Sequence, residues 1–160
     1  MMQIKVVAVG KLKERFWQAG VDEYLKRLKS YAKVEIIEVE DEKCPEAYSV
    51  AQALQVKQRE GQRIIKAVGL GSFVIALHLT GKEFTSEGFA AYLDDLALNS
   101  RSHVTFIIGG SLGLANEVLE RADLHLVFSR FTLPHQLIRV VLLEQLYRAC
   151  KISRNEPYHK

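Results

Sequence analysis

The sequence of 160 residues has few of the residues that cross-link or interrupt a chain. It contains three prolines, two cysteines and no low-complexity tract, which excludes a disulfide-rich scaffold and favours an ordered chain. Cys44 and Cys150 lie far apart and form no CxxC pair, so we expect reduced thiols and a cytoplasmic protein. No histidine, cysteine and carboxylate residues have metal-ligand spacing, and we therefore expect no metal.

Long hydrophobic runs are also missing. The apolar segment Met1–Gly10 is short and contains Lys5, so we expect no signal peptide. No stretch approaches the roughly 20 apolar residues of a membrane span, and we expect no membrane partner. With 48% hydrophobic and 26% charged residues, the composition predicts one globular domain over residues 1–160. The net charge of +3 permits a polyanionic partner without requiring one.

Apolar segments rich in β-branched residues alternate with longer amphipathic segments. The expected strands are Ile4–Val9, Val34–Val39, Phe73–Leu79, Val104–Ile108 and Leu124–Phe128. The expected helices are Glu14–Tyr31, Ala47–Val68, Ser86–Leu98, Asn116–Ala122 and Gln136–Ile152. This alternation predicts an α/β fold in which helices cover both faces of a parallel sheet.

Ligands of open parallel sheets bind where loops leave the carboxyl ends of the strands. In this sequence the rule selects residues 77–82, 108–114 and 128–135. The second segment contains Gly109, Gly110 and Gly113, whose backbone can turn sharply and approach a ligand. The helix that follows would add N–H groups at its start. The pattern matches neither a P-loop nor GxGxxG, and a simple strand-to-helix turn explains it equally well.

The third segment leads through Thr132, Leu133 and Pro134 into the last helix. Pro134 restricts the backbone and keeps Leu133 extended, so the loop can present donors and acceptors to a flat base. By itself the segment is more typical of an ordinary helix start with proline near the first turn.

Apolar side chains cover almost the whole circumference of the last helix. They are Leu137, Ile138, Val140, Val141, Leu142, Leu143, Leu146, Ala149 and Cys150. Such a helix is buried on all sides, either in the centre of one protomer or against a second copy. We favour the second interpretation, which predicts a homodimer. The tail 154–160 is either a frayed end or a mobile segment with base-stacking, titratable and phosphate-binding side chains.

Taken together, these segments resemble the small SPOUT methyltransferases, which methylate N3 of a pseudouridine in large-subunit ribosomal RNA. The likeness extends over the whole chain and rests on the order and spacing of several motifs. They are Val7-Ala8-Val9-Gly10, Glu23-Tyr24-Leu25-Lys26-Arg27, Leu77 with Gly81-Lys82, Ile108-Gly109-Gly110 with Gly113, Thr132-Leu133-Pro134-His135, Arg139-Val140, Glu144-Gln145-Leu146-Tyr147-Arg148-Ala149 and Pro157-Tyr158-His159-Lys160. Thr80 stands where relatives can carry proline, and Lys160 where some carry arginine.

The resemblance implies a single SPOUT domain whose C-terminal part, residues 73–153, forms a deep trefoil knot that binds S-adenosylmethionine. The positions that match the family's cofactor site are Leu77, Gly109, Gly110, Phe128, Ser129, Arg130, Phe131, Thr132 and Leu133. Arg130 occupies a position in this loop that we regard as variable.

The implied reaction is S-adenosylmethionine-dependent methylation of a pseudouridine in 23S ribosomal RNA, with assembled ribosomes as the partner. The N3 proton must leave, and Tyr158, His159 and Lys160 are the candidate catalytic residues because their side-chain types can stack, transfer a proton or contact phosphate. A flavodoxin-like nucleotide-binding domain and a ribosome-binding protein without chemistry are the two alternatives.

Overall fold

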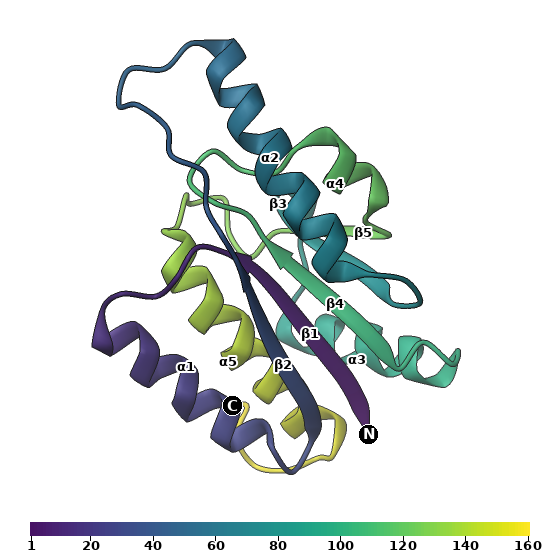
Figure 1. Ribbon diagram of the computed structural model, residues 1–160. Coiled ribbons are helices and arrows are strands. Elements are labelled where there is room, and N and C mark those ends of the chain that lie inside the picture. The colour runs from purple at the N-terminus through teal and green to yellow at the C-terminus, as the bar shows by residue number, and fades with distance from the viewer.

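The computed structural model describes all 160 residues as five strands and five helices that alternate along the chain (Figure 1). In chain order they are β1 (Met2–Val9), α1 (Arg15–Leu28), β2 (Ala32–Val39), α2 (Val50–Val68), β3 (Phe73–Lys82), α3 (Ser86–Leu98), β4 (His103–Ile108), α4 (Asn116–Arg121), β5 (Leu124–Leu126) and α5 (His135–Ser153). Every expected strand and helix is present, with ends that differ by a few residues.

The strands form one sheet in the order β2-β1-β4-β3-β5, and every neighbouring pair is parallel. The central strands β1 and β4 are apolar on both faces, and Val6, Val7, Phe106 and Ile107 have no exposed surface. A strand that is buried on both faces has a continuous run of apolar residues. This is why these strands could be predicted from the sequence. The predicted α/β class is confirmed.

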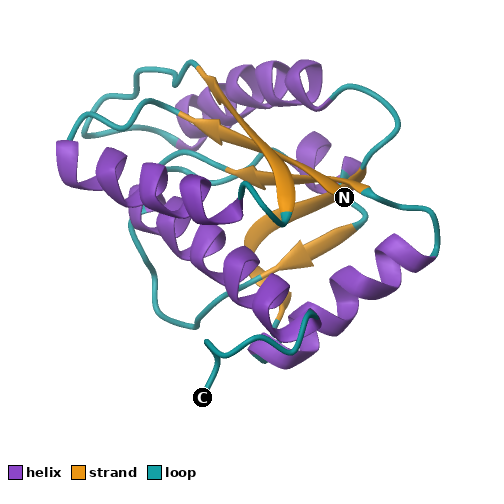
Figure 2. Cartoon of the chain, turned by 90° about the horizontal axis from the view of Figure 1, so that it is seen from below, coloured by secondary structure: helices purple, strands orange, loops and turns teal.

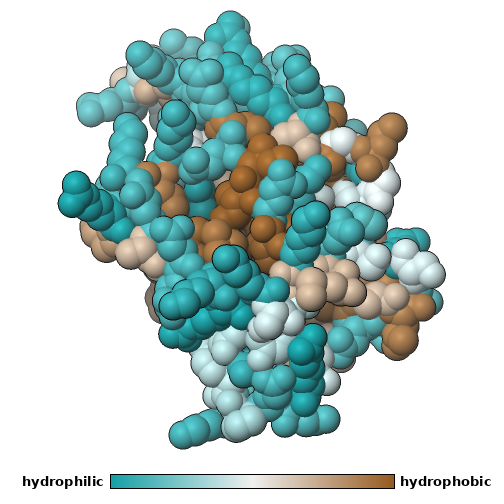
Figure 3. Space-filling model, turned by 60° about the horizontal axis from the view of Figure 1, so that its bottom comes forward, coloured by the Kyte–Doolittle hydropathy of each residue, from teal (hydrophilic) through white to brown (hydrophobic).

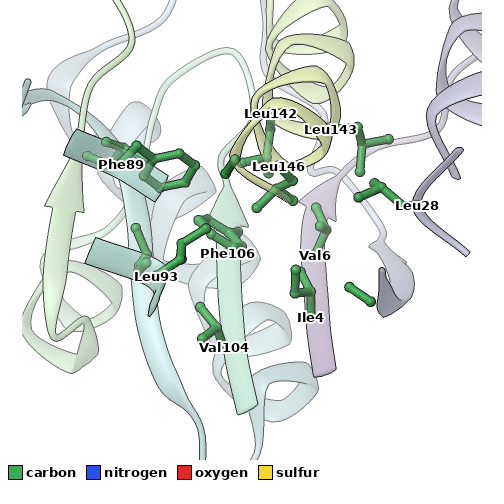
Figure 4. Packing of buried hydrophobic residues seen from close by; sticks show 14 of the residues in the cluster. Ile4, Val6, Leu28, Phe89, Leu93, Val104, Phe106, Leu142, Leu143 and Leu146 are labelled. Carbon is green, nitrogen blue, oxygen red and sulfur yellow. The ribbon is translucent and has the colours of Figure 1, made fainter. Parts of the chain in front are cut away.

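Helices cover the sheet on both faces (Figure 2). On one face α1, α5 and α3 lie over the larger apolar cluster, where Phe89, Phe106 and Leu146 meet in the core (Figure 4). On the other face α2 and α4 cover a smaller cluster around Val7 and Ile64. Each fully buried side chain of this size contributes about 1.5–3 kcal/mol to folding. The sheet is therefore held between two apolar layers.

Helix α5 lies between α1 and α3 and packs on the sheet. Its two neighbouring helices and the sheet therefore bury three of its sides. Leu142 and Leu143 have no exposed surface and point into the core of the same protomer (Figure 4). Arg139 is 3% exposed; it donates one hydrogen bond to Glu38 Oε2 at 2.6 Å and another to the Gly10 carbonyl at 3.2 Å. The core-helix interpretation therefore accounts for the buried side of α5, and these leucines are no sign of a dimer.

The molecular face in Figure 3 is mainly hydrophilic, with apolar side chains gathered across its middle. None of the helices combines the length and the apolar character that a membrane crossing requires. The deep knot that the family resemblance implies stays a prediction.

Candidate functional site

The end of β3 forms one wall of the site. Its pairing with β5 shifts register between Leu77 and Lys82, so the residues between them bulge away from the regular ladder. Gly81 lies directly against the backbone of β5, where an added Cβ would stand 2.6 Å from the carbonyl carbon of Leu126. Any larger residue at position 81 would clash with the backbone of β5. Glycine therefore allows the bulged part of β3 to pack directly against β5.

A cavity of about 350 Å³ opens where the bulged part of β3 and the loops after β4 and β5 meet the start of α5. Most of the residues predicted for the cofactor line it, namely Leu77, Gly109, Gly110, Phe128, Ser129, Phe131, Thr132 and Leu133. Arg130 lies in the same loop but outside the lining; its side chain is 94% exposed and its Nε is 3.5 Å from Glu83 Oε1. The structure thus brings segments from three separate strand ends around one space.

The glycine loop folds tightly on itself at the edge of this cavity. The N–H of Gly113 donates to the Gly110 carbonyl at 3.1 Å, and Gly113 has a φ of +86°, which glycine adopts readily. An added Cβ on Gly109 would stand 2.9 Å from Leu114 Cδ2. The following helix α4 begins at Asn116 and contributes no residue to the lining, so the expected role of its first N–H groups is not found.

The loop before α5 closes the opposite side of the cavity. The side chain of Ser129 accepts a hydrogen bond from the Phe131 N–H at 3.0 Å, which makes a compact turn. The Phe131 ring is 82% exposed, at the rim of the cavity. Pro134 then caps α5 with extended backbone angles, φ −57° and ψ 139°. The segment is therefore an ordinary helix start and a cavity wall at the same time.

Two histidines that carried no prediction lie in the cavity wall. Burial lowers the pKa of His78, and the nearby His125, whose ring centre is 5.7 Å away, lowers it further. Burial also lowers the pKa of His135, with Arg139 adding to the effect. Both rings are therefore held toward the neutral form. His78 received no role because it belongs to no motif, although it directly follows Leu77 in a selected segment. His135 closes the motif Thr132-Leu133-Pro134-His135, but the motif alone assigned its side chain no role.

The C-terminal tail is packed against the protein, so the frayed-end interpretation is wrong. The Tyr158 hydroxyl donates to Glu144 Oε1 at 3.1 Å. His159 Nε2 lies 2.6 Å from Glu87 Oε1, and its Nδ1 is 3.2 Å from Arg148 Nη1. Upstream, Glu156 Oε2 accepts hydrogen bonds from Tyr31 and Lys151 at 2.6 and 2.8 Å. Three residues of the tail, Glu156, Tyr158 and His159, are thus anchored, mostly on side chains of α3 and α5.

Within one protomer the tail and the cavity remain apart. None of Tyr158, His159 and Lys160 lines the cavity. Tyr158 is held at Glu144, which lies six residues of α5 beyond the cavity residue Ile138, or about 9 Å along the helix axis. Burial and the neighbouring Glu144 raise the pKa of Tyr158, so its phenol is a neutral donor at physiological pH.

Comparisons with known proteins agree with this architecture. A family model described as predicted SPOUT methyltransferase matches residues 2–159. Ribosomal RNA large subunit methyltransferase H of Desulfitobacterium hafniense (strain Y51) is 57% identical over 160 residues, 100% of both chains. The protein of the same name from Enterococcus faecalis (strain ATCC 700802 / V583) is 52% identical over 159 residues, 99% of this chain and 100% of the relative.

A solved structure shares the fold at much lower sequence similarity. A probable methylase family protein from Haemophilus influenzae Rd KW20 superposes with a TM-score of 0.56 at 16% identity, covering 98% of this chain and 70% of that one. This likeness supports the fold alone. The family model spans nearly the whole chain, and the two relatives are more than half identical over their full lengths. On these grounds the chain belongs to the SPOUT methyltransferase family.

Proposed function

We propose that this protein uses S-adenosylmethionine to methylate N3 of a pseudouridine in 23S ribosomal RNA of the large ribosomal subunit. The observation that carries the proposal is the cavity in which Leu77, the glycine loop and the Phe128–Leu133 loop meet. The relatives named for methylation of large-subunit ribosomal RNA support the choice of substrate. The neutral forms of His78 and His135 add no charge that would repel a cationic cofactor, and Lys57 is the one lysine or arginine in the cavity wall.

The volume and the lining of the cavity support binding of S-adenosylmethionine. Its volume of about 350 Å³ lies within the usual range of small-molecule sites. Leu77 and Leu133 offer apolar walls for a flat base, and Gly109 and Gly110 contribute backbone to the lining. The missing side chains of these two glycines make room for Leu114, Glu60 and Val9, which pack directly against the loop. When bound, the cofactor supplies an already activated methyl group. The protein then has to align it, and alignment is worth about 7–11 kcal/mol in favourable cases.

Removal of the N3 proton is assigned to the tail. His159 is the proposed proton acceptor, with Tyr158 as a stacking surface and Lys160 as a phosphate contact. In the free protein both ring nitrogens of His159 are engaged, by Glu87 and Arg148. The ring therefore has to leave these partners before it can accept a proton. Binding of RNA to the tail would supply the replacement contacts.

A homodimer in the cytoplasm is the proposed working form. Leu137 and Val141 lie on α5, are only partly buried and belong to neither apolar cluster of the protomer. A two-fold contact through this side of α5 would cover them and bring the tail of one subunit close to the cavities of both. A single compact domain has no separate RNA-binding domain, so the surface of the dimer would have to recognise the shape of the target. Assembled ribosomes, which present that shape, are therefore the expected substrate.

Incubation with labelled S-adenosylmethionine and ribosomes lacking the modification, followed by nucleoside mass spectrometry, tests the proposal. We expect 3-methylpseudouridine from ribosomes, much less product from a short RNA, and less again when uridine replaces the target pseudouridine. Equal rates on the oligonucleotide and on ribosomes would contradict recognition of the assembled target. Absence of cofactor binding would favour a ribosome-binding protein, and bound flavin after purification would favour a flavodoxin-like domain.

A further inference from the structure

Glu60 is a buried carboxylate with one unpaired oxygen. It lies in α2, is 4% exposed, and its Oε2 accepts the Glu42 N–H at 2.9 Å. Its Oε1 is buried and has no hydrogen-bond partner. A carboxylate oxygen removed from water without a partner is costly, so its retention calls for an explanation.

Glu60 does not line the cavity itself, but it lies directly behind Gly110, which does. Gly110 lines the cavity, and a Cβ added to it would stand 3.1 Å from Glu60 Oε1 and 3.4 Å from Oε2. The missing side chain of Gly110 thus lets the carboxylate approach the backbone that forms this part of the cavity wall. In an interior of low effective dielectric constant, a charge at such a place acts strongly on charges inside the cavity.

The arginines near Glu60 are engaged elsewhere. Arg63 pairs with Glu42 at 2.7 Å, and Arg59 pairs with the same carboxylate at 2.9 Å. Burial raises the pKa of Glu60, the Glu42 N–H opposes this, Asp41 raises it again, and Arg63 lowers it. The glycine loop and the end of β1, which packs here through Val9, add no charged group. No cation forms an ion pair with Glu60, although Arg63 lowers its pKa through space. Lys57, one turn earlier on α2, lines the same cavity.

We propose that Glu60 makes the cavity selective for the cationic methyl donor over its neutral product. The inference rests on the proposed function. In the transfer the bond between the sulfonium sulfur and the methyl carbon breaks and its electron pair stays on sulfur. The methyl carbon bonds to N3 of the base, and the N3 proton leaves to the acceptor. The cofactor loses one positive charge, so S-adenosylhomocysteine is no longer attracted by Glu60 and dissociates more readily.

Glu60→Gln is the variant that isolates charge from shape. The amide keeps the volume of the side chain and an oxygen that accepts the Glu42 N–H. Titration calorimetry of S-adenosylmethionine and S-adenosylhomocysteine on the wild-type protein and on E60Q tests the proposal. We expect E60Q to weaken binding of the donor about tenfold, a change equivalent to about 1.4 kcal/mol, and binding of the product less than about twofold.

Asp41→Asn is the matched control. Asp41 lies beside Glu60 but is exposed, so water screens its charge. We expect this variant to leave the ratio of the two affinities unchanged.

The outcomes separate the inference from the function on which it rests. An unchanged affinity ratio in E60Q, or an equal loss for both ligands, overturns the inference and leaves the function standing. A wild-type protein that binds neither ligand overturns the proposed function itself. An E60Q protein that does not fold also contradicts the inference, because a neutral amide of the same shape removes the cost of a buried charge.

Discussion

The carboxylate of Glu60 occupies the space toward which a side chain on Gly110 would point. An added Cβ would stand 3.1 Å from Glu60 Oε1 and 3.2 Å from Val9 Cγ1. Packing against α2 and β1 therefore requires glycine at this position, in addition to any requirement of the ligand. Substitution of Gly110 will consequently affect the stability of the protein as well as the cavity.

Gly110→Ala is expected to destabilise the protein by about 1–3 kcal/mol, the usual cost of overpacking. The same substitution in a Glu60→Ala background should cost about 1 kcal/mol less, because the oxygen that it meets is gone. Urea denaturation of the two single variants and the double variant measures this coupling. Equal costs in both backgrounds would show that the contact with Glu60 is unimportant. S-adenosylmethionine binding is then measured on those variants that remain folded.

Two glycines inside helices offer a test of packing away from the cavity. A Cβ on Gly20 would make an ordinary contact of 3.5 Å with Val140, whereas one on Gly61 would be crowded at 3.2 Å by Ala115. Gly20→Ala should raise the free energy of unfolding by about 0.5–1 kcal/mol, since glycine weakens a helix by that amount. Gly61→Ala should gain less or lose stability. Thermal unfolding compares them, and the reverse order would contradict the packing between α1 and α5.

The dimer is tested at Val141 rather than at the leucines of the core. Val141→Glu places a charge on the partly buried side of α5 and should abolish the dimer while the protomer stays folded, since burying an unpaired charge costs several kcal/mol. Leu142→Glu is the contrast, because Leu142 has no exposed surface and its substitution should unfold the protomer itself. Light scattering and circular dichroism separate the two effects. A wild-type protein that is monomeric at micromolar concentration would refute the dimer.

Removal of Tyr158, His159 and Lys160 should abolish methyl transfer but leave cofactor binding nearly unchanged. The deleted contacts with Glu144 and Glu87 lie near the surface, where water screens them, so their loss should leave the fold and the cavity intact. Single-turnover assays at saturating cofactor and ribosome measure the chemical step. His159→Ala alone should lower this rate more than cofactor affinity. A wild-type rate in the truncated protein would show that the tail only packs on α5.

Glu60→Gln should also change how stability depends on pH. Burial raises the folded-state pKa of Glu60 above 4.5, so the folded protein binds this proton more readily than the unfolded chain. The carboxylate therefore costs stability once the pH rises through its folded-state pKa. E60Q should be more stable than the wild-type protein at about pH 8, and the difference should shrink as the pH falls toward 4.5. A difference that stays constant across this range would contradict a raised pKa.

Local patterns in the sequence determined the layout of the protein. The alternation of β-branched and amphipathic segments predicted all ten elements, because strands buried on both faces and helices with one apolar side leave distinct periodicities. The three segments 77–82, 108–114 and 128–135 were predicted to meet, because parallel strands place their carboxyl ends at one edge of the sheet. The cofactor itself followed from the resemblance to the SPOUT family.

Contacts between residues far apart in the chain were decided only by the tertiary structure. Three such features depend on how the helices pack across the sheet. They are the contact of Glu60 with Gly110, the hydrogen bond from Tyr158 to Glu144 and the position of His78 in the cavity wall. The apolar circumference of α5 was compatible with a core helix and with a dimer helix, and the sequence led us to favour the dimer helix. Its position between α1 and α3 assigned Leu142 and Leu143 to the core of one protomer, because packing, not periodicity, determines what an apolar side chain meets.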